Sequence, residues 1–367
     1  MAVSDIQTKI DEMEGELSGA KYNKSTEHHF AVVKAQIAKL REKMEKRQAS
    51  KGGGTGWSIK KSGDASVILL GFPSVGKSTL LNKLTSAKSK VAAYEFTTLD
   101  VIPGVLEYHN AKIQILDVPG VIQGAAEGRG RGKEVLGMVR AADLILILID
   151  ALHPEHYEVL LKELYQAGVR PNQRPPDVKV KSKTRGGIDL GTTVKLTKVS
   201  RDSLMTILKE FRLNNVDVLV RTDVDLDQFI DALEGNRAYI PAVPVITKAD
   251  LLPQNELQRL VNRLKPAAVV SAERGDGIDD LKEAIFHGLR FVRVFLKEVN
   301  KKPDLDEPLV LRHGATIKTV CERLHRDFVR KFRFAKIWGS SAKFPGQVFR
   351  DIGKPLKDGD IIELHIE

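Results

Sequence analysis

The sequence predicts an α/β protein with an inserted α+β module and a small β-rich module at its C-terminal end. Three observations carry this prediction. Apolar strands alternate with helices over residues 65–150 and 242–289, which is typical of a mostly parallel sheet flanked by helices. The intervening residues 170–237 contain several prolines and a basic run, together with helix and strand patterns. The pattern changes again after about residue 291.

Length and composition indicate a soluble protein of two or three domains. The chain has 367 residues, of which 42% are hydrophobic and 29% charged. No apolar run reaches the roughly 18 residues of a membrane span, and the polar N-terminus does not resemble a signal peptide. The single cysteine, Cys321, cannot form an internal disulfide. We therefore expect a cytoplasmic protein without a membrane partner.

Four segments are expected as structural modules. They are a helical hairpin over 1–50, a main domain over 64–290, the α+β insert within it over 170–237, and a C-terminal domain over 291–367. The glycine-rich stretch 51–56 reads as a flexible linker. The hairpin is predicted from apolar residues at helical spacing: Ile6, Ile10, Met13 and Leu17, and then Phe30, Val33, Ile37, Leu40 and Met44.

Secondary structure is predicted from the apolar periodicity. In the main domain we expect strands at 67–70, 101–108, 112–117, 143–150, 242–247 and 268–270, and helices at 78–84, 155–167, 255–264 and 278–289. In the insert we expect helices at 203–211 and 226–233 and a strand at 216–221. In the C-terminal domain we expect strands at 291–296 and 360–366 and a helix at 316–328.

The charge is strongly basic, with a formal net charge of +10. Three segments concentrate it: residues 21–51 hold nine Lys/Arg against three Asp/Glu, residues 170–201 nine against two, and residues 318–336 seven against two. Such segments attract polyanions, so a ribosome or RNA is the expected partner. Ordinary solvated basic surfaces remain the alternative for each segment.

A phosphate-binding P-loop organises the chain. The sequence G-x-x-x-x-G-K-S follows an apolar strand and precedes a helix, which is the context that this motif needs. Its backbone N–H groups and the helix N-terminus face an anion. Lys77 is expected to reach the β- and γ-phosphates, and the Ser78 hydroxyl to bind Mg²⁺. The candidate nucleotide-binding residues here are Gly71, Phe72, Pro73, Ser74, Val75, Gly76, Lys77, Ser78 and Thr79.

Two further segments complete the expected phosphate and metal site. Asp117 ends an apolar strand and begins Asp-Val-Pro-Gly120, so its carboxylate is expected to hold Mg²⁺ and the Gly120 N–H to bond the γ-phosphate. Between this motif and the P-loop lies Tyr-Glu-Phe-Thr-Thr-Leu, in which Thr98, in preference to Thr97, is the expected metal ligand. The alternative is that these threonines have no ligand and are present because threonine favours β-strands.

A base-reading motif is expected at Thr247-Lys-Ala-Asp250, at the end of another strand. A carboxylate at Asp250 can accept hydrogen bonds from guanine N1–H and the exocyclic amine, whereas adenine offers no such donor pair. Lys248 is expected to pack its stem along the base. Thr247 stands where the N-K-x-D pattern has Asn and can make fewer hydrogen bonds. Ser271 and Ala272 are expected to complete the pocket.

Together these motifs resemble the Obg-like group of translation-factor-related GTPases, and within it the developmentally regulated GTP-binding protein (DRG) family. The resemblance extends to the glycine-rich stretch 124–132 and to Glu-Gly-Asn-Arg-Ala-Tyr-Ile-Pro at 234–241, and it covers nearly the whole chain. It implies a helical hairpin, a GTPase domain with a ribosomal-protein-like α+β insert, and a C-terminal TGS domain. It also implies GTP hydrolysis, action with translating ribosomes and a stabilising partner protein.

The sequence departs from related patterns in ways that affect hydrolysis. Val121 stands where Ras-like enzymes place a water-orienting Gln, and Ser74 where potassium-activated relatives often have Asn. Slow hydrolysis without a partner or K⁺ is therefore expected, and no catalytic residue is assigned. Arg129 and Arg131 can be charge-stabilising groups or solvated side chains. An ATP-hydrolysing relative and an RNA-binding scaffold with weak turnover are the alternative functions.

Overall fold

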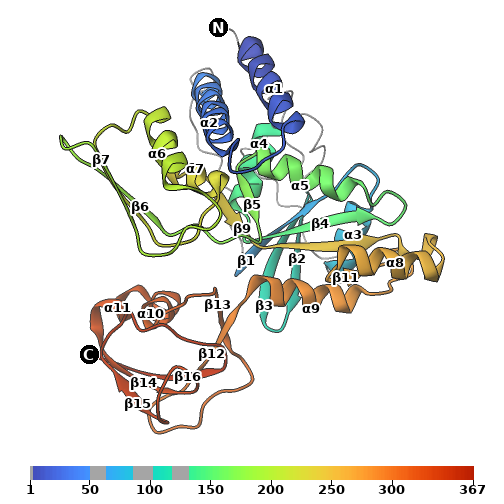
Figure 1. Ribbon diagram of the computed structural model, residues 1–367. Helices are drawn as coiled ribbons and strands as arrows, with labels where there is room; N and C mark the ends of the chain where they lie inside the picture. The colour runs from blue at the N-terminus through green and yellow to red at the C-terminus, as the bar shows by residue number, and fades with distance from the viewer. Residues whose placement is uncertain (1–2, 50–62, 86–101, 118–131) are drawn as a thin grey trace. The chain divides into compact units, whose positions relative to one another are not determined.

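The computed structural model describes residues 3–49, 63–85, 102–117 and 132–367 (Figure 1). The chain divides into two compact units, one made of Met1–Trp57 and Gln173–Tyr239, the other of Ser58–Asn172 and Ile240–Glu367. The predicted fold class is confirmed, because a P-loop α/β domain carries a helical hairpin, an α+β insert and a β-rich C-terminal module. The linker 51–56 lies outside the described residues.

A six-stranded sheet forms the centre of the larger unit, in the order β11-β10-β4-β1-β3-β2. Its strands are β1 (Ala65–Leu70), β2 (Ile102–Tyr108), β3 (Ala111–Asp117), β4 (Leu144–Asp150), β10 (Ala242–Thr247) and β11 (Ala268–Val269). All neighbours pair in parallel except β2 and β3. β1 and β4 are buried along their whole length, which explains their continuous apolar sequences.

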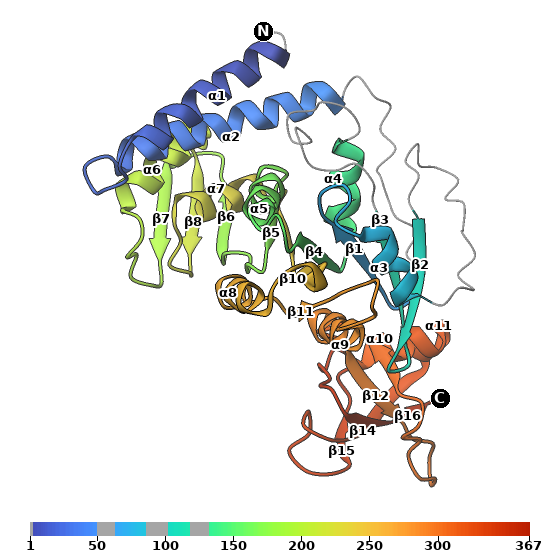
Figure 2. The same ribbon diagram turned by 90° about the vertical axis from the view of Figure 1, so that its right-hand side faces the viewer.

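Helices cover both faces of this sheet (Figure 2). On one face, α3 (Lys77–Leu84) and α9 (Ile278–Leu289) pack in the cluster that contains Val67, Leu146 and Val245. On the other, Leu260 of α8 (Gln254–Leu264) packs against Ile246. The unit also contains α4 (Gly132–Ala141), α5 (His156–Gln166), the short η1 (Ala249–Leu251) and β5 (Val169–Pro171). No helix in the described parts of the chain is long and apolar enough to cross a membrane.

The C-terminal module is a five-stranded sheet in the order β13-β12-β16-β14-β15, with two helices over one face (Figure 1). Its elements are β12 (Val292–Leu296), β13 (Leu309–Leu311), α10 (Ile317–Leu324), α11 (Arg326–Lys331), β14 (Phe332–Trp338), β15 (Gln347–Phe349) and β16 (Asp360–Ile366). Its own core gathers Val294, Ile317, Val320, Ile337 and Ile362.

The single helix predicted over 316–328 is wrong in one respect, because the structure contains two helices. His325 has φ −162° and ψ 138°, an extended conformation that ends α10. The same residue caps α11, since its Nδ1 accepts a hydrogen bond from Asp327 N at 3.2 Å. Apolar spacing continues across this break, so the pattern alone did not reveal it.

The hairpin and the insert form the smaller unit together, although about 125 residues separate them in the sequence. The unit contains α1 (Val3–Gly19), α2 (Glu27–Ala49), β6 (Val178–Ser182), β7 (Ile188–Thr192), α6 (Arg201–Glu210), β8 (Val216–Val220) and α7 (Leu226–Glu234); β9 (Ala238–Ile240) ends at its boundary. The predicted α1–α2 seam is present, with Ile6, Ile10, Val33 and Ile37 buried in one cluster. Phe30, Ala31 and Ala35 instead pack with the core of the insert.

Polar contacts also join α2 to the insert. The Lys34 ammonium lies 2.5 Å from the Asp227 carboxylate, and Lys39 Nζ donates to the carbonyl of Glu210 at 2.5 Å. Ser200 N donates to the Glu27 carboxylate at 2.7 Å. Two of the cations that make residues 21–51 basic are therefore used inside the unit, which leaves fewer of them for a partner.

Candidate functional site

The loop after β1 has the tight geometry of a phosphate cradle. A Cβ on Gly71 would lie 2.8 Å from Val75 Cγ1 and 3.1 Å from the Leu148 carbonyl oxygen, so only glycine fits there. Gly76 has φ 96° and begins α3. Ser74 has φ 62°, in the left-handed region where asparagine is better tolerated than most residues. The first turn of α3 has no side-chain cap among the described residues, so its N–H groups are available to an anion.

Lys77 is folded back onto this loop. Its Nζ donates to the carbonyl oxygens of Gly71 at 2.9 Å and Phe72 at 3.0 Å. Burial lowers the pKa of Lys77, although the charge of Asp117 opposes the shift. Phosphate oxygens are stronger acceptors than these carbonyls, so a bound phosphate can replace them as the partner of the ammonium.

The two predicted metal ligands in the described chain meet directly. Ser78 Oγ donates to Asp117 Oδ2 at 2.7 Å, from the start of α3 to the end of β3. Asp117 is 3% exposed, and its Oδ1 is buried with no hydrogen-bond partner among the described residues. A buried unpaired carboxylate oxygen beside a hydroxyl fits a hard cation such as Mg²⁺. The other expected contributors, Thr98 and Gly120, lie outside the described residues, as do Val121, Arg129 and Arg131.

The base motif lies at the same edge of the sheet, at the end of β10. Thr247 is 2% exposed, and its Oγ1 lies 2.9 Å from the Val75 carbonyl oxygen and 3.2 Å from that of Ile149. A hydroxyl carries one hydrogen, whereas the asparagine amide of the usual motif can donate two. Thr247 therefore ties the base motif to the P-loop, but with one fewer donated bond.

Asp250 has polar partners in the loop after β11. A hydrogen bond from the Ser271 hydroxyl lowers the pKa of the Asp250 carboxyl, although its partial burial acts in the opposite direction. Arg274 Nε lies 3.9 Å from Asp250 Oδ2. Ser271 is 2% exposed, and Ala272 packs against the central core. The carboxylate is therefore held ionised, the state that accepts hydrogen bonds from guanine.

Comparison with known proteins finds family models that match successive parts of the chain. Residues 66–182 match the model of a "50S ribosome-binding GTPase", residues 185–291 that of the "C-terminal region of MMR_HSR1 domain", and residues 292–366 that of the TGS domain. An uncharacterized GTP-binding protein of Methanocaldococcus jannaschii is 51% identical, with 100% of this chain and 94% of that protein covered.

Named relatives decide the family. The developmentally-regulated GTP-binding protein 2 homolog of Dictyostelium discoideum is 42% identical, over 98% of this chain and 99% of its own length. The developmentally-regulated G-protein 2 of Arabidopsis thaliana is also 42% identical, over 98% and 91%. This chain belongs to the developmentally regulated GTP-binding protein family. The resemblance drawn from the motifs is thus confirmed, as are the GTPase and TGS domains that it implies.

Two features of this DRG-family site were missed by the sequence reasoning. Asp150, at the end of β4, lies 2.7 Å from the ammonium of Lys248. Its place after a buried strand of the same sheet could have indicated it. The ring of Phe72 stacks on His156 of α5, with centroids 3.9 Å apart and planes at 16°. No pattern in the sequence links those two residues, because the contact depends on how α5 packs.

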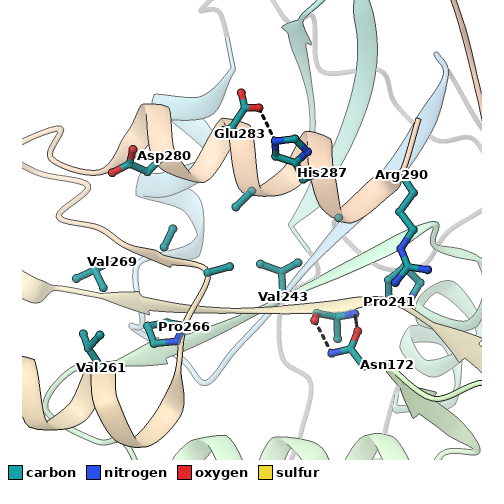
Figure 3. A pocket seen from close by; sticks show the side chains of 15 residues that line it. Asn172, Pro241, Val243, Val261, Pro266, Val269, Asp280, Glu283, His287 and Arg290 are labelled. Atoms are coloured by element: carbon teal, nitrogen blue, oxygen red, sulfur yellow. Dashed lines mark hydrogen bonds and ion pairs between the residues drawn. The ribbon is translucent and has the colours of Figure 1, made fainter. Parts of the chain in front are cut away.

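A separate hollow of about 780 Å³ lies between α9, β10 and β11 of this DRG-family protein (Figure 3). None of the predicted site residues lines it. Three of its polar side chains are paired: Glu283 and His287 lie 2.7 Å apart, and the Asn172 side chain exchanges two hydrogen bonds with the backbone of Ala242. The hollow therefore does not belong to the phosphate and base site.

Proposed function

We propose that this protein is a Mg²⁺-dependent GTP-binding and GTP-hydrolysing switch that acts with ribosomes in the cytoplasm. The observation that carries the proposal is the meeting of three groups at one sheet edge: the P-loop with Lys77, the Ser78–Asp117 pair, and Asp250 on the neighbouring motif. When bound, Mg²⁺ neutralises charge on the β- and γ-phosphates. Ser78 and Asp117 would hold it, with Thr98 as a further proposed ligand.

The deciding experiment is competitive binding of GTP and ATP in the presence of Mg²⁺. Asp250 favours GTP, because adenine cannot satisfy a buried carboxylate. Equal affinity for the two nucleotides would favour the alternative of an ATP-hydrolysing relative. Failure to bind either would favour an RNA-binding scaffold.

Hydrolysis is expected to be slow in the isolated protein. Val121 has no group that orients water, and the two arginines of the glycine-rich stretch, Arg129 and Arg131, lie outside the described residues. We expect K⁺ or ribosomes to accelerate single-turnover GTP hydrolysis well above the rate in Na⁺ buffer. For scale, an activator raises the intrinsic rate of Ras about 10⁵-fold. A fast rate in Na⁺ without a partner would mean that the chain already contains a complete catalytic set.

The ribosome role is supported by the matched family model, whose name refers to the 50S subunit, and by the basic insert. Lys179, Lys181 and Arg185 make no ion pair within the described residues and are exposed. Lys183 differs, because its ammonium is paired with both Asp189 and Asp217. All four cations belong to the basic segment 170–201. Because Lys183 is already paired, the other three are the ones available to RNA phosphates.

Replacing Lys179, Lys181 and Arg185 by Gln is expected to flatten the salt dependence of ribosomal RNA binding. Each lost phosphate contact lowers the slope of log affinity against log salt by roughly 0.7 to 0.9. Lys183→Gln is the matched control and should leave the slope unchanged. Filter binding over a range of KCl concentrations measures both. Equal slopes in the triple variant and the wild type would make these residues ordinary solvated charges.

The C-terminal TGS domain is expected to be dispensable for nucleotide binding, since no phosphate or base motif lies in it. Phe291 and Val310 both belong to the core of the larger sheet, so a chain cut at 290 would lose both, whereas a chain cut at 292 loses only Val310 of that cluster. A chain ending at residue 292 should bind GTP with wild-type affinity, as measured by isothermal titration. Loss of binding in a folded 1–292 chain would show that the TGS domain contributes to the site.

We also propose that the protein binds a stabilising partner protein.

A further inference from the structure

Asp150 lies beside the base motif through the register of the central sheet. β4 and β10 run in parallel, and Asp150 and Thr247 are paired residues at their carboxyl ends. The Asp150 side chain is 10% exposed. Its Oδ1 accepts a hydrogen bond from Leu152 N at 3.0 Å, and its Oδ2 faces the Lys248 ammonium at 2.7 Å. Both carboxylate oxygens are thus used, one to close the turn after β4 and one to hold a lysine.

The partner lysine has an unusual backbone. Lys248 has φ 55° and ψ 36°, a left-handed conformation that non-glycine residues adopt at some cost. That conformation turns the chain into η1, which carries Asp250. The lysine side chain is 33% exposed, so without a partner its stem would sample several rotamers. Burial raises the pKa of the Asp150 carboxyl, but hydrogen bonds from Lys248 and Leu152 N outweigh it and lower the pKa overall.

We propose that Asp150 is a positioning residue of the base site: its ion pair with Lys248 holds the lysine stem in place as a wall for the guanine ring. This inference rests on the proposed GTP binding and adds a residue to it. Asp150 touches no atom of the nucleotide in this role. The ion pair restricts the rotamers of Lys248 before a base binds, so less side-chain conformational entropy is lost on binding.

The two aspartates of the base site then have separable effects. Asp250 reads the hydrogen-bond donors of guanine, so its loss should change which base is preferred. Asp150 orients a side chain that packs on the ring face, and all purines have similar ring faces. Its loss should therefore weaken GTP, GDP and ITP by the same factor. Inosine lacks the exocyclic amine, so the ratio of GTP to ITP affinity reports on Asp250 alone.

The test is nucleotide affinity of the full chain with Asp150→Asn, Lys248→Met and both together. Asparagine keeps an oxygen for Leu152 N but presents an amide N–H₂ to the ammonium, and methionine keeps a stem of similar length without charge. We expect each single variant to bind GTP and GDP about tenfold more weakly, the size of one charge-assisted hydrogen bond. The double variant should be no weaker than Lys248→Met alone, and the GTP-to-ITP ratio should stay at its wild-type value.

Asp358→Asn is the matched control, because it breaks an Arg293–Asp358 ion pair in the TGS domain and should leave nucleotide affinity unchanged. Wild-type affinity in Asp150→Asn would overturn the inference. Full additivity of the two affinity losses in the double variant would also overturn it, because Asp150 would then act on folding and not through Lys248. A wild-type protein without preference for GTP over ATP would instead refute the proposed function. The two failures are therefore distinguishable.

Discussion

Asp250→Asn is expected to lower GTP affinity about 100-fold or more while ATP affinity changes little. In the proposed site the Asp250 carboxylate accepts two hydrogen bonds from guanine, and charge-assisted bonds of this kind contribute about 1.5–3 kcal/mol each. Asparagine can accept one of them, and its N–H₂ group faces a donor on the base. The GTP-to-ITP ratio should fall toward one, since the exocyclic amine loses its acceptor. Isothermal titration with GTP, ITP and ATP measures all three affinities.

Asp279→Asn provides the control for charge. Asp279 lies in the first turn of α9, with its side chain 91% exposed and paired with Lys282. It carries the same charge as Asp250 but belongs to neither the P-loop nor the base motif. We expect this variant to bind all three nucleotides like the wild type. If Asp250→Asn kept full GTP affinity, guanine would have to be read by other groups, and the assignment of Thr247-Lys-Ala-Asp250 would be wrong.

Glu363→Gln is expected to destabilise the TGS domain by about 3 kcal/mol. Glu363 lies on β16 with its side chain 3% exposed, and three side chains surround it: Lys297, Lys336 at 3.2 Å and His365 at 2.7 Å. Burial alone would raise the pKa of Glu363, but hydrogen bonds from these three residues lower it to about 2. Glutamine carries no charge, so the side chains around position 363 would lose the carboxylate anion that they share.

The Glu363 carboxylate makes the stability of the TGS domain depend on pH. Its pKa in the folded protein, about 2, is below the value of 4.5 in an unpaired glutamate. The stabilisation is therefore complete above about pH 5 and is lost as the pH falls toward 2, a change of about 3 kcal/mol. Glu363→Gln should unfold with much less dependence on pH in that range. A wild-type TGS domain equally stable at pH 3 and pH 6 would contradict this account.

Trp338 offers the readout for both experiments, because Lys297 Nζ lies 4.9 Å from the centre of its ring. Trp57 is the only other tryptophan, so a Trp57→Phe background isolates the signal. Denaturant unfolding of the full chain, followed by Trp338 fluorescence, then reports on the TGS domain. Glu322→Gln is the control, since its exposed ion pair with Lys318 at 3.7 Å should contribute only a few tenths of a kcal/mol.

The fold class could be predicted from the amino-acid sequence alone, and so could most residues of the candidate site. Strands that are buried on both faces have continuous apolar sequences, so β1 and β4 could be read directly. The P-loop and the motifs at Asp117 and Asp250 each follow such a strand, and parallel strands bring their carboxyl ends to one edge. The sequence alone therefore predicts that Lys77, Ser78, Asp117 and Asp250 lie at the same edge of the sheet.

Other elements needed the tertiary structure. Strand β6 has Lys179 and Lys181 alternating with exposed Val180, and the sequence showed it only as part of a basic run. A strand at the edge of a small sheet lacks a continuous apolar pattern, so no strand was predicted there. The union of the hairpin with the insert depends on packing of Phe30 and Ala35 against α6 and α7, which the seam pattern does not encode.

The same division holds within the site. A motif names the residues that follow one another along the chain, and Thr247, Lys248 and Asp250 were found in that way. The role of Asp150 depends on a pairing across two strands about a hundred residues apart. The difference between paired Lys183 and its unpaired neighbours likewise depends on Asp217 from another strand. Spacing along the chain carries no information about either contact, so only the folded arrangement of the strands could decide them.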